Sequence, residues 1–138
     1  MAKITLNYSP NFSPKRRISK NIKYLVIHYT GMKDEKKAID RLTDKKSKVS
    51  CHYFIKINGE IILLVPESYI AWHAGVSSWK NKKSLNKFSI GIEIHNKGHD
   101  HGYSKFTEAQ INSTIVLCKK LIKKYKISNN NILGHSDI

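Results

Sequence analysis

Apolar residues occur along the chain in short runs with the spacing of strands. Residues 24–29, Tyr-Leu-Val-Ile-His-Tyr, form a β-branched and aromatic run that Thr30-Gly31 ends, which predicts a buried strand. Residues 88–94 predict a second strand, in which Gly91 indicates that another group approaches the backbone closely. A short strand is expected at 131–133, shortly before the end of the chain.

A hairpin is predicted between residues 51 and 65. Two apolar runs, 51–57 and 60–65, flank the dipeptide Asn58-Gly59. This dipeptide favours a type I′ turn, because both central residues of that turn need a positive φ. Pro66 is expected to end the second strand.

Two segments have the spacing of amphipathic helices. Asp34 is a suitable N-cap for a helix that places Ala38, Ile39 and Leu42 on one face. Thr107 and Gln110 have the spacing of a capping box at the start of a second helix. Its apolar residues step by four and three, and its lysines fall on the other side. The apolar face predicted for it comprises Ile111, Ile115, Cys118, Ile122 and Tyr125.

Strands and helices are therefore mixed, and the predicted fold class is α/β or α+β in one domain. A chain of 138 residues is of single-domain length. Residues 1–20 contain Pro10, Pro14 and a basic cluster, so they are expected to form an irregular arm. No apolar run approaches the roughly 20 residues of a membrane-spanning helix.

The net charge of +15 raises the question of a nucleic-acid partner. All but three of the 25 basic residues are lysines, whereas arginine is the usual reader of phosphates and base edges. We therefore interpret the charge as a compositional bias and do not expect nucleic acid as the partner. Cys51 and Cys118 are expected to be buried thiols. With no secretory signal visible, they favour the cytoplasm, although a processed start could hide a signal.

Histidines and one glutamate are the candidates for chemistry. His28 and His135 each stand at the end of an apolar run, where imidazoles could share a metal ion, although two distant histidines alone do not establish a site. Glu93 interrupts an apolar strand, so it is paired, bound to a metal, used in chemistry or on a solvated face. His52 is interpreted as a hydrogen-bonded structural residue. His99 and His101 are interpreted as part of an exposed loop.

Five motifs occur in one order, and any one of them alone would be weak. Together they resemble the zinc-dependent N-acetylmuramoyl-L-alanine amidases of the phage-lysozyme and peptidoglycan-recognition-protein type, and most of all the bacterial branch that cleaves anhydromuropeptides or cell-wall fragments. The motifs are Tyr24 to Thr30, Ser50 to Ile55 with Asn58-Gly59, Ala71-Trp72-His73-Ala74-Gly75, Ser89 to Glu93, and Gly134 to Ile138.

The resemblance implies a fold and a set of residue roles. The fold is a central mixed β-sheet flanked by helices, with zinc in a surface groove. His28 and His135 match zinc ligands, and Glu93 matches the acidic residue that handles the proton of water. Trp72 and His73 match a loop that lines the substrate cleft. The implied activity is hydrolysis of the amide bond between the lactyl group of N-acetylmuramic acid and L-alanine, in peptidoglycan or its muropeptide fragments.

The chain also departs from the family pattern. The family's third zinc ligand follows the second histidine by about ten residues, whereas this sequence ends at Ile138, so residues 21–138 are expected to form an amidase domain without its C-terminal ligand segment. A non-catalytic peptidoglycan-binding module on the same fold is therefore the alternative. Some relatives carry a catalytic tyrosine where this chain has Cys51, which favours Glu93 as the proton acceptor.

Overall fold

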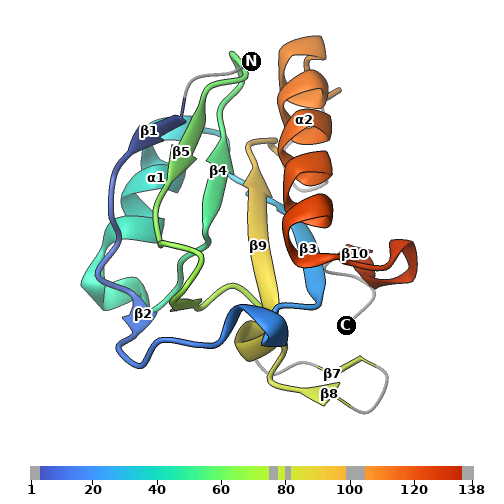
Figure 1. Ribbon diagram of the computed structural model, residues 1–138. Helices are drawn as coiled ribbons and strands as arrows, with labels where there is room; N and C mark the ends of the chain where they lie inside the picture. The colour runs from blue at the N-terminus through green and yellow to red at the C-terminus, as the bar shows by residue number, and fades with distance from the viewer. Residues whose placement is uncertain (1–3, 75–77, 80–81, 99–104, 135–138) are drawn as a thin grey trace.

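The computed structural model describes residues 4–74, 78–79, 82–98 and 105–134. Its regular elements follow one another in the order seen in Figure 1. Short 3-10 turns lie at Ser19–Asn21, Lys45–Ser47, Leu85–Phe88 and Asn129–Asn131. The strands and α-helices are β1 (Ile4–Leu6), β2 (Phe12–Ser13), β3 (Tyr24–Tyr29), α1 (Glu35–Thr43), β4 (Tyr53–Ile55), β5 (Ile61–Leu63), β6 (Ile70–Ala71), β7 (Ser78–Trp79), β8 (Lys82–Lys83), β9 (Ser89–Ile94), α2 (Glu108–Tyr125) and β10 (Ile132–Gly134).

A central sheet organises the described residues. Its strand order is β1-β5-β4-β9-β3-β10, with β2 and β6 forming one small antiparallel pair and β7 and β8 another. Within the central sheet β4 and β5 are antiparallel and the other neighbours are parallel. The predicted mixed sheet is therefore confirmed.

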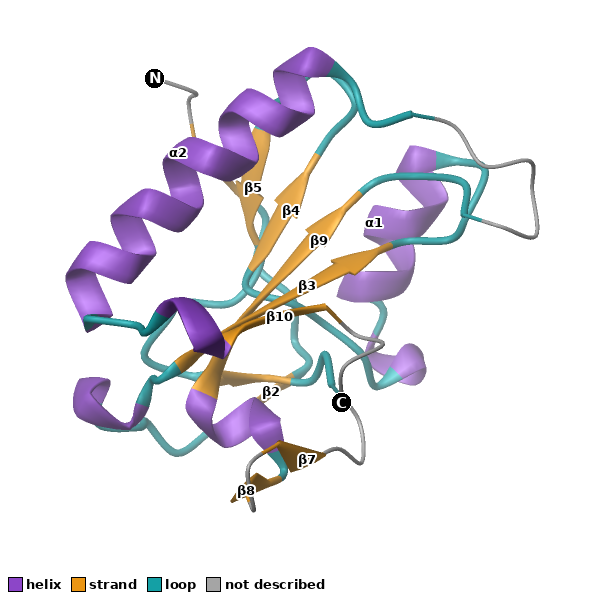
Figure 2. Cartoon of the chain, turned by 90° about the vertical axis from the view of Figure 1, so that its right-hand side faces the viewer, coloured by secondary structure: helices purple, strands orange, loops and turns teal. Residues whose placement is uncertain are grey.

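The two α-helices cover opposite faces of this sheet, as Figure 2 shows. Leu117 and Leu121 of α2 pack with Leu25, Ile90 and Ile92 of the central strands. Ala38 and Leu42 of α1 pack on the other face in a smaller cluster that includes Phe54. Burying each large apolar side chain contributes about 1.5–3 kcal/mol, so each helix is held to the sheet by its apolar face. Among the described residues, no helix combines the length and apolar character needed to cross a membrane.

The N-terminal segment differs from the irregular arm that was expected. Ile4–Leu6 pairs in parallel with Ile61–Leu63 at the edge of the central sheet, and Phe12–Ser13 pairs with β6. These strands are only three and two residues long, so their alternation is too brief to be recognised in the sequence. Their partner strands, β5 and β6, lie far along the chain, and a local sequence pattern does not indicate such a pairing.

The hairpin between β4 and β5 is confirmed, but the predicted type I′ turn is wrong. The amide of Gly59 donates to the carbonyl of Lys56 at 2.9 Å, so the turn begins one residue earlier than expected. Gly59 has a φ of +88°, whereas Asn58 is not among the residues with positive φ. The Asn58 side chain instead accepts a bond from the amide of Glu60 at 2.9 Å. This local bond favours a longer loop with a single left-handed glycine.

The caps of both helices agree with the prediction, whereas the predicted apolar face of α2 is confirmed only in part: Cys118, Ile122 and Tyr125 pack against the core, but Ile111 and Ile115 do not. Asp34 accepts from the amide of Lys37, and Thr107 and Gln110 form the full capping box. The buried residues of α2 are Gln110, Ser113, Leu117 and Leu121, while Ile111 and Ile115 are about half exposed, at 48% and 46%. Hydrogen bonds decide this face: Gln110 Nε2 donates to the His95 carbonyl and Ser113 Oγ to the Gly59 carbonyl.

Candidate functional site

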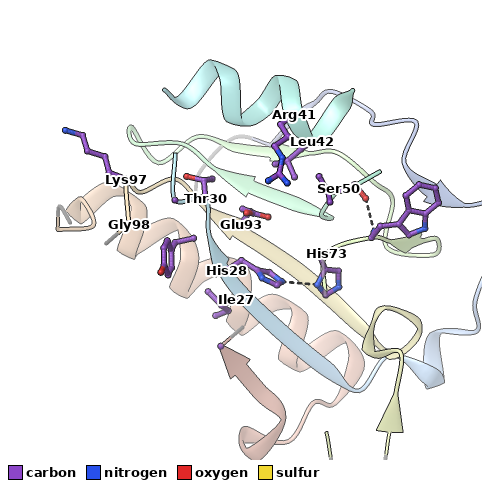
Figure 3. A pocket seen from close by; sticks show the side chains of 15 residues that line it. Ile27, His28, Thr30, Arg41, Leu42, Ser50, His73, Glu93, Lys97 and Gly98 are labelled. Carbon is purple, nitrogen blue, oxygen red and sulfur yellow. Dashed lines mark hydrogen bonds between the residues drawn. The ribbon is translucent and has the colours of Figure 1, made fainter. Parts of the chain in front are cut away.

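A groove of about 740 Å³ opens on the α1 side of the sheet. His28 near the end of β3 and Glu93 near the end of β9 line it, and the two residues are direct neighbours in the parallel register of these strands. Neighbouring residues in a parallel pair project to the same face, so both side chains enter the groove, as Figure 3 shows. The strand pairing therefore brings together two residues that are far apart in the sequence.

His73 enters the same groove from the loop after β6. Its Nδ1 lies 3.0 Å from Nε2 of His28, and the two rings meet edge to face (Figure 3). A Cβ atom at position 91 would lie only 2.4 Å from His73 Cγ. The expected close approach at Gly91 is therefore the approach of the His73 ring, which needs a residue without a side chain beneath it.

The side chain of Asn86 holds the backbone of this loop at His73 and Ala74. Asn86 Oδ1 accepts from the amides of His73 and Ala74 at 3.2 and 2.8 Å. Ala74 is buried with Tyr24, Leu85 and Leu133 in a small apolar cluster. The position of His73 is thus set by the backbone bonds of its loop as well as by the contacts of its ring.

Trp72 also lines the groove and is anchored to the N-terminal segment. Its indole Nε1 donates to Ser13 Oγ at 3.1 Å, and its amide donates to Ser50 Oγ at 2.9 Å. The tryptophan is half-buried, which leaves part of the indole facing the groove. The segment expected to be an irregular arm therefore helps to shape this wall.

The electrostatic character of Glu93 differs from that of an ordinary surface carboxylate. The residue is half-buried, and desolvation of its carboxyl group raises the pKa to about 7. The positive charge of Arg41, which reaches from α1 toward Glu93 in Figure 3, acts in the opposite direction. A carboxyl group with a pKa near neutrality can both accept and return a proton.

His52 lies beneath the groove and is structural, as predicted. It is fully buried, its Nδ1 accepts from the Gly91 amide at 3.0 Å, and its Nε2 donates to the Tyr69 carbonyl at 2.9 Å. Burial, together with the nearby Arg17 charge, lowers its pKa to about 3, so the ring is neutral. Of the expected buried thiols, Cys51 is buried and Cys118 is half-buried, and both are free.

Several residues of the sequence motifs, together with the two loop histidines, fall outside the described part of the chain. His135, Asp137, Gly75, His99 and His101 belong to this group. Gly134, which precedes His135 in the sequence, pairs with Ile27, which precedes His28. Within the described ranges, no group of three or more His, Cys, Asp and Glu side chains is arranged to hold a metal ion. The described residues thus supply imidazole and carboxylate donors of the kind that zinc prefers, without a complete ligand set.

Sequence reasoning missed four residues around this site. Arg41 and Lys97 line the groove and bring positive charge to it. Ser89 bonds to His73, and Arg17 bonds to the Ser89 carbonyl at 2.7 Å. Alternation along β9 places Ser89 on the same face as Gly91 and Glu93, so Ser89 could have been found. The other three carry no local signal, because Arg41 and Lys97 reach the groove, and Arg17 reaches Ser89, through tertiary contacts.

Comparison with known proteins agrees with this geometry. Residues 18–138 match the family model Amidase_2, described as N-acetylmuramoyl-L-alanine amidase. The chain is 42% identical to N-acetylmuramoyl-L-alanine amidase AmiD of Escherichia coli over 85% of its length and 46% of that protein. It is 33% identical to 1,6-anhydro-N-acetylmuramyl-L-alanine amidase AmpD of Haemophilus influenzae, over 94% of this chain and 78% of the relative.

Solved structures show the same fold. A complex of E. coli AmiD with anhydro-N-acetylmuramic acid-L-Ala-D-gamma-Glu-L-Lys has a TM-score of 0.76 at 39% identity, over 91% of this chain and 52% of that one. An AmpD structure has a TM-score of 0.81 at 31% identity, over 100% of this chain and 84% of that one. Against several of the curated relatives that it matches, this chain spans about half of their length, 46% for AmiD.

Proposed function

The chain belongs to the N-acetylmuramoyl-L-alanine amidase family, Amidase_2, and from that premise we propose that it hydrolyses the amide bond between the lactyl group of N-acetylmuramic acid and L-alanine. The observation that carries this proposal is the pairing of His28 with Glu93 across adjacent parallel strands in one groove. The substrate class we propose is a muropeptide, because structural neighbours at 39% and 32% identity are complexes with anhydromuramic peptides.

The proposed metal is zinc, held by His28 and His135. His28 offers an imidazole near the end of β3. Gly134, the last residue of β10, pairs with Ile27, the residue before His28. Zinc, when bound, lowers the pKa of a water molecule toward about 7 and polarises a carbonyl. A donor from another part of the protein, or water, completes the ligand set in this proposal.

Glu93 is the proposed general base and acid. It takes a proton from the attacking water, and the water oxygen forms a bond to the lactyl carbonyl carbon. It then returns the proton to the amide nitrogen as the carbon–nitrogen bond breaks. The products are a lactyl sugar acid and a free stem peptide. The pKa of Glu93, raised to about 7 by burial, suits both transfers near neutral pH.

The groove walls are proposed to bind the muropeptide. Trp72 and His73 form one side, where the anchored indole offers an apolar surface for a sugar or peptide. Arg41 and Lys97 lie on the other side and favour the carboxylates of a stem peptide. We keep the cytoplasm as the expected compartment, supported by the free thiols of Cys51 and Cys118.

Replacement of Glu93 tests this function. Glu93→Gln keeps the shape of the side chain but removes the base, so stem-peptide release from a muropeptide should fall by about 10²–10⁴-fold. Zinc content, measured by elemental analysis, should stay at the wild-type level. Glu108→Gln is the matched control, because Glu108 is an exposed residue of the first turn of α2.

The other outcomes separate the alternatives. Unchanged turnover in Glu93→Gln would overturn the role of Glu93. Stoichiometric zinc without any turnover in the wild-type chain would instead indicate a binding module. A chain that holds no zinc and releases no peptide would contradict both the metal and the activity proposed for these residues.

A further inference from the structure

Ser89 is a fully buried hydroxyl at the start of β9, and it has one proton to donate. Its Oγ lies 2.8 Å from the carbonyl oxygen of Leu85 and 3.0 Å from Nε2 of His73. A carbonyl oxygen can only accept, so the hydroxyl proton of Ser89 lies on the bond to Leu85. The bond to His73 therefore uses a lone pair of Ser89, and His73 Nε2 must carry a hydrogen.

This assignment also decides whether Nδ1 of His73 donates or accepts a hydrogen bond. A neutral imidazole has one N–H and one lone pair, so Nδ1 of His73 is an acceptor. Nδ1 lies 3.0 Å from Nε2 of His28, and His28 must then donate the hydrogen of that bond. In the neutral ring of His28, the lone pair consequently resides on Nδ1.

We propose that Ser89 and His73 are positioning residues, which fix His28 in the tautomer whose Nδ1 lone pair serves as the metal donor. The metal part of this inference rests on the proposed function, whereas the tautomer does not. Metal-binding histidines commonly donate their second ring nitrogen to a neighbouring acceptor, which orients the ring and increases its basicity. Here the acceptor is Nδ1 of His73 instead of a carboxylate.

The surroundings of Ser89 and His73 hold these two side chains in place. The His73 ring lies against Gly91, where even a Cβ atom would be 2.4 Å from Cγ of the ring. The carbonyl of Ser89 accepts from Arg17 Nη1 at 2.7 Å, so the backbone that carries the hydroxyl is itself anchored. The ring of His73 thus contacts His28 and Ser89 at its two nitrogens, while Asn86 holds the backbone of its loop.

The tautomers can be measured directly on the metal-free chain. Long-range ¹H–¹⁵N correlation spectra of the wild-type protein at about pH 8 should show both His28 and His73 with the hydrogen on Nε2. In Ser89→Ala, which keeps the carbonyl that Arg17 uses, the His73 spectrum should lose its single fixed tautomer. A His28 spectrum with the hydrogen on Nδ1 in the wild-type chain would overturn the inference.

Zinc affinity supplies an independent readout, by competition with a chromophoric chelator. His73→Leu removes the acceptor and should weaken zinc binding by about 10–100-fold, as for other partners of metal-ligating histidines. His73→Asn is the matched control, because its amide oxygen can take the place of Nδ1, so its affinity should stay near the wild-type value. Wild-type affinity in His73→Leu would contradict the inference.

The two proposals fail separately. A wild-type chain that binds no zinc would contradict the proposed function, and the tautomer spectrum would still decide whether Ser89 and His73 fix His28. Circular dichroism of each variant confirms that the fold is retained. If His73→Leu does not fold, the comparison of Ser89→Ala with wild type carries the test.

Discussion

At the scale of single residues, burial shifts the pKa values of His52 and Glu93 in opposite directions. The pKa of His52 is lowered to about 3 and that of Glu93 is raised to about 7. Desolvation is the largest cause in both, because it disfavours whichever form is charged. His52 has both ring nitrogens in hydrogen bonds and serves the fold, whereas Glu93 faces the groove.

His52 should make the protein sensitive to acid. Below its usual pKa of 6.5 the unfolded chain binds a proton that the folded chain does not bind until about pH 3. The free energy of unfolding should therefore fall as the pH is lowered through this window, by at most roughly 1.4 kcal/mol per pH unit. Glu93 has the opposite effect on the free energy of unfolding between about pH 7 and pH 4.5. As the pH falls, its carboxylate takes up a proton at a higher pH in the folded state than in the unfolded state.

The contribution of His52 is isolated by comparing wild type with His52→Gln. The variant should be less stable at pH 7, because glutamine replaces the bonds of the ring imperfectly, but the gap should narrow as the pH falls toward 4. Urea unfolding at several pH values measures this difference. A gap that stays constant from pH 7 to pH 4 would show that His52 titrates alike in both states.

At the scale of elements, α2 shows how buried polar residues rotate a helix. Of the predicted apolar face, Cys118, Ile122 and Tyr125 pack against the core, whereas Ile111 and Ile115 are about half exposed. The buried residues are instead Gln110, Ser113, Leu117 and Leu121. The two polar members donate to backbone carbonyls of the loops after β9 and β4. Their bonds allow burial without an unsatisfied group, which a count of apolar residues cannot anticipate.

Substitutions on the two faces of α2 should have unequal costs. Leu117→Ala removes a side chain that is 2% exposed and should cost about 2–5 kcal/mol of unfolding free energy. Ile115→Ala, at 46% exposure, should cost clearly less. Chemical denaturation of the two variants measures both values. Equal losses would contradict the unequal burial of Leu117 and Ile115 in α2.

At the scale of the whole molecule, Arg17 joins segments that are distant in the chain. Its guanidinium donates to the carbonyls of Glu67, Asn86 and Ser89, at distances from 2.7 to 3.1 Å. Desolvation lowers its pKa to about 10, so the group stays charged at neutral pH. The same residue thus ties the N-terminal segment to the start of β9, where Ser89 contacts His73.

Arg17→Met should destabilise the protein by about 3 kcal/mol or more, because it leaves several carbonyls with lost partners. Arg16→Met is the control, since Arg16 is exposed and stacks on Tyr69, and it should change stability little. Thermal and urea unfolding of both variants provide the comparison. Similar losses in the two would show that Arg17 is no more important than its exposed neighbour.

The sequence by itself determined the elements that local chemistry controls. Helix caps at Asp34 and Thr107, the strand at residues 24–29 and the hairpin around Gly59 depend on residues close together in the chain. The ordered motifs also indicated the family, which the comparisons confirm. The expected close approach at Gly91 followed from the absence of a side chain in an otherwise bulky strand.

Only the tertiary structure decided which distant groups meet. The pairing of His28 with His73, the bond from Ser89 to His73 and the anchoring of β9 by Arg17 join segments 16 to 72 residues apart. The same is true of β1 at the sheet edge and of the face that α2 buries. Periodicity reports how residues near one another in the chain share a surface, whereas a hydrogen bond between segments depends on strand register and loop path, which are set when the whole core packs.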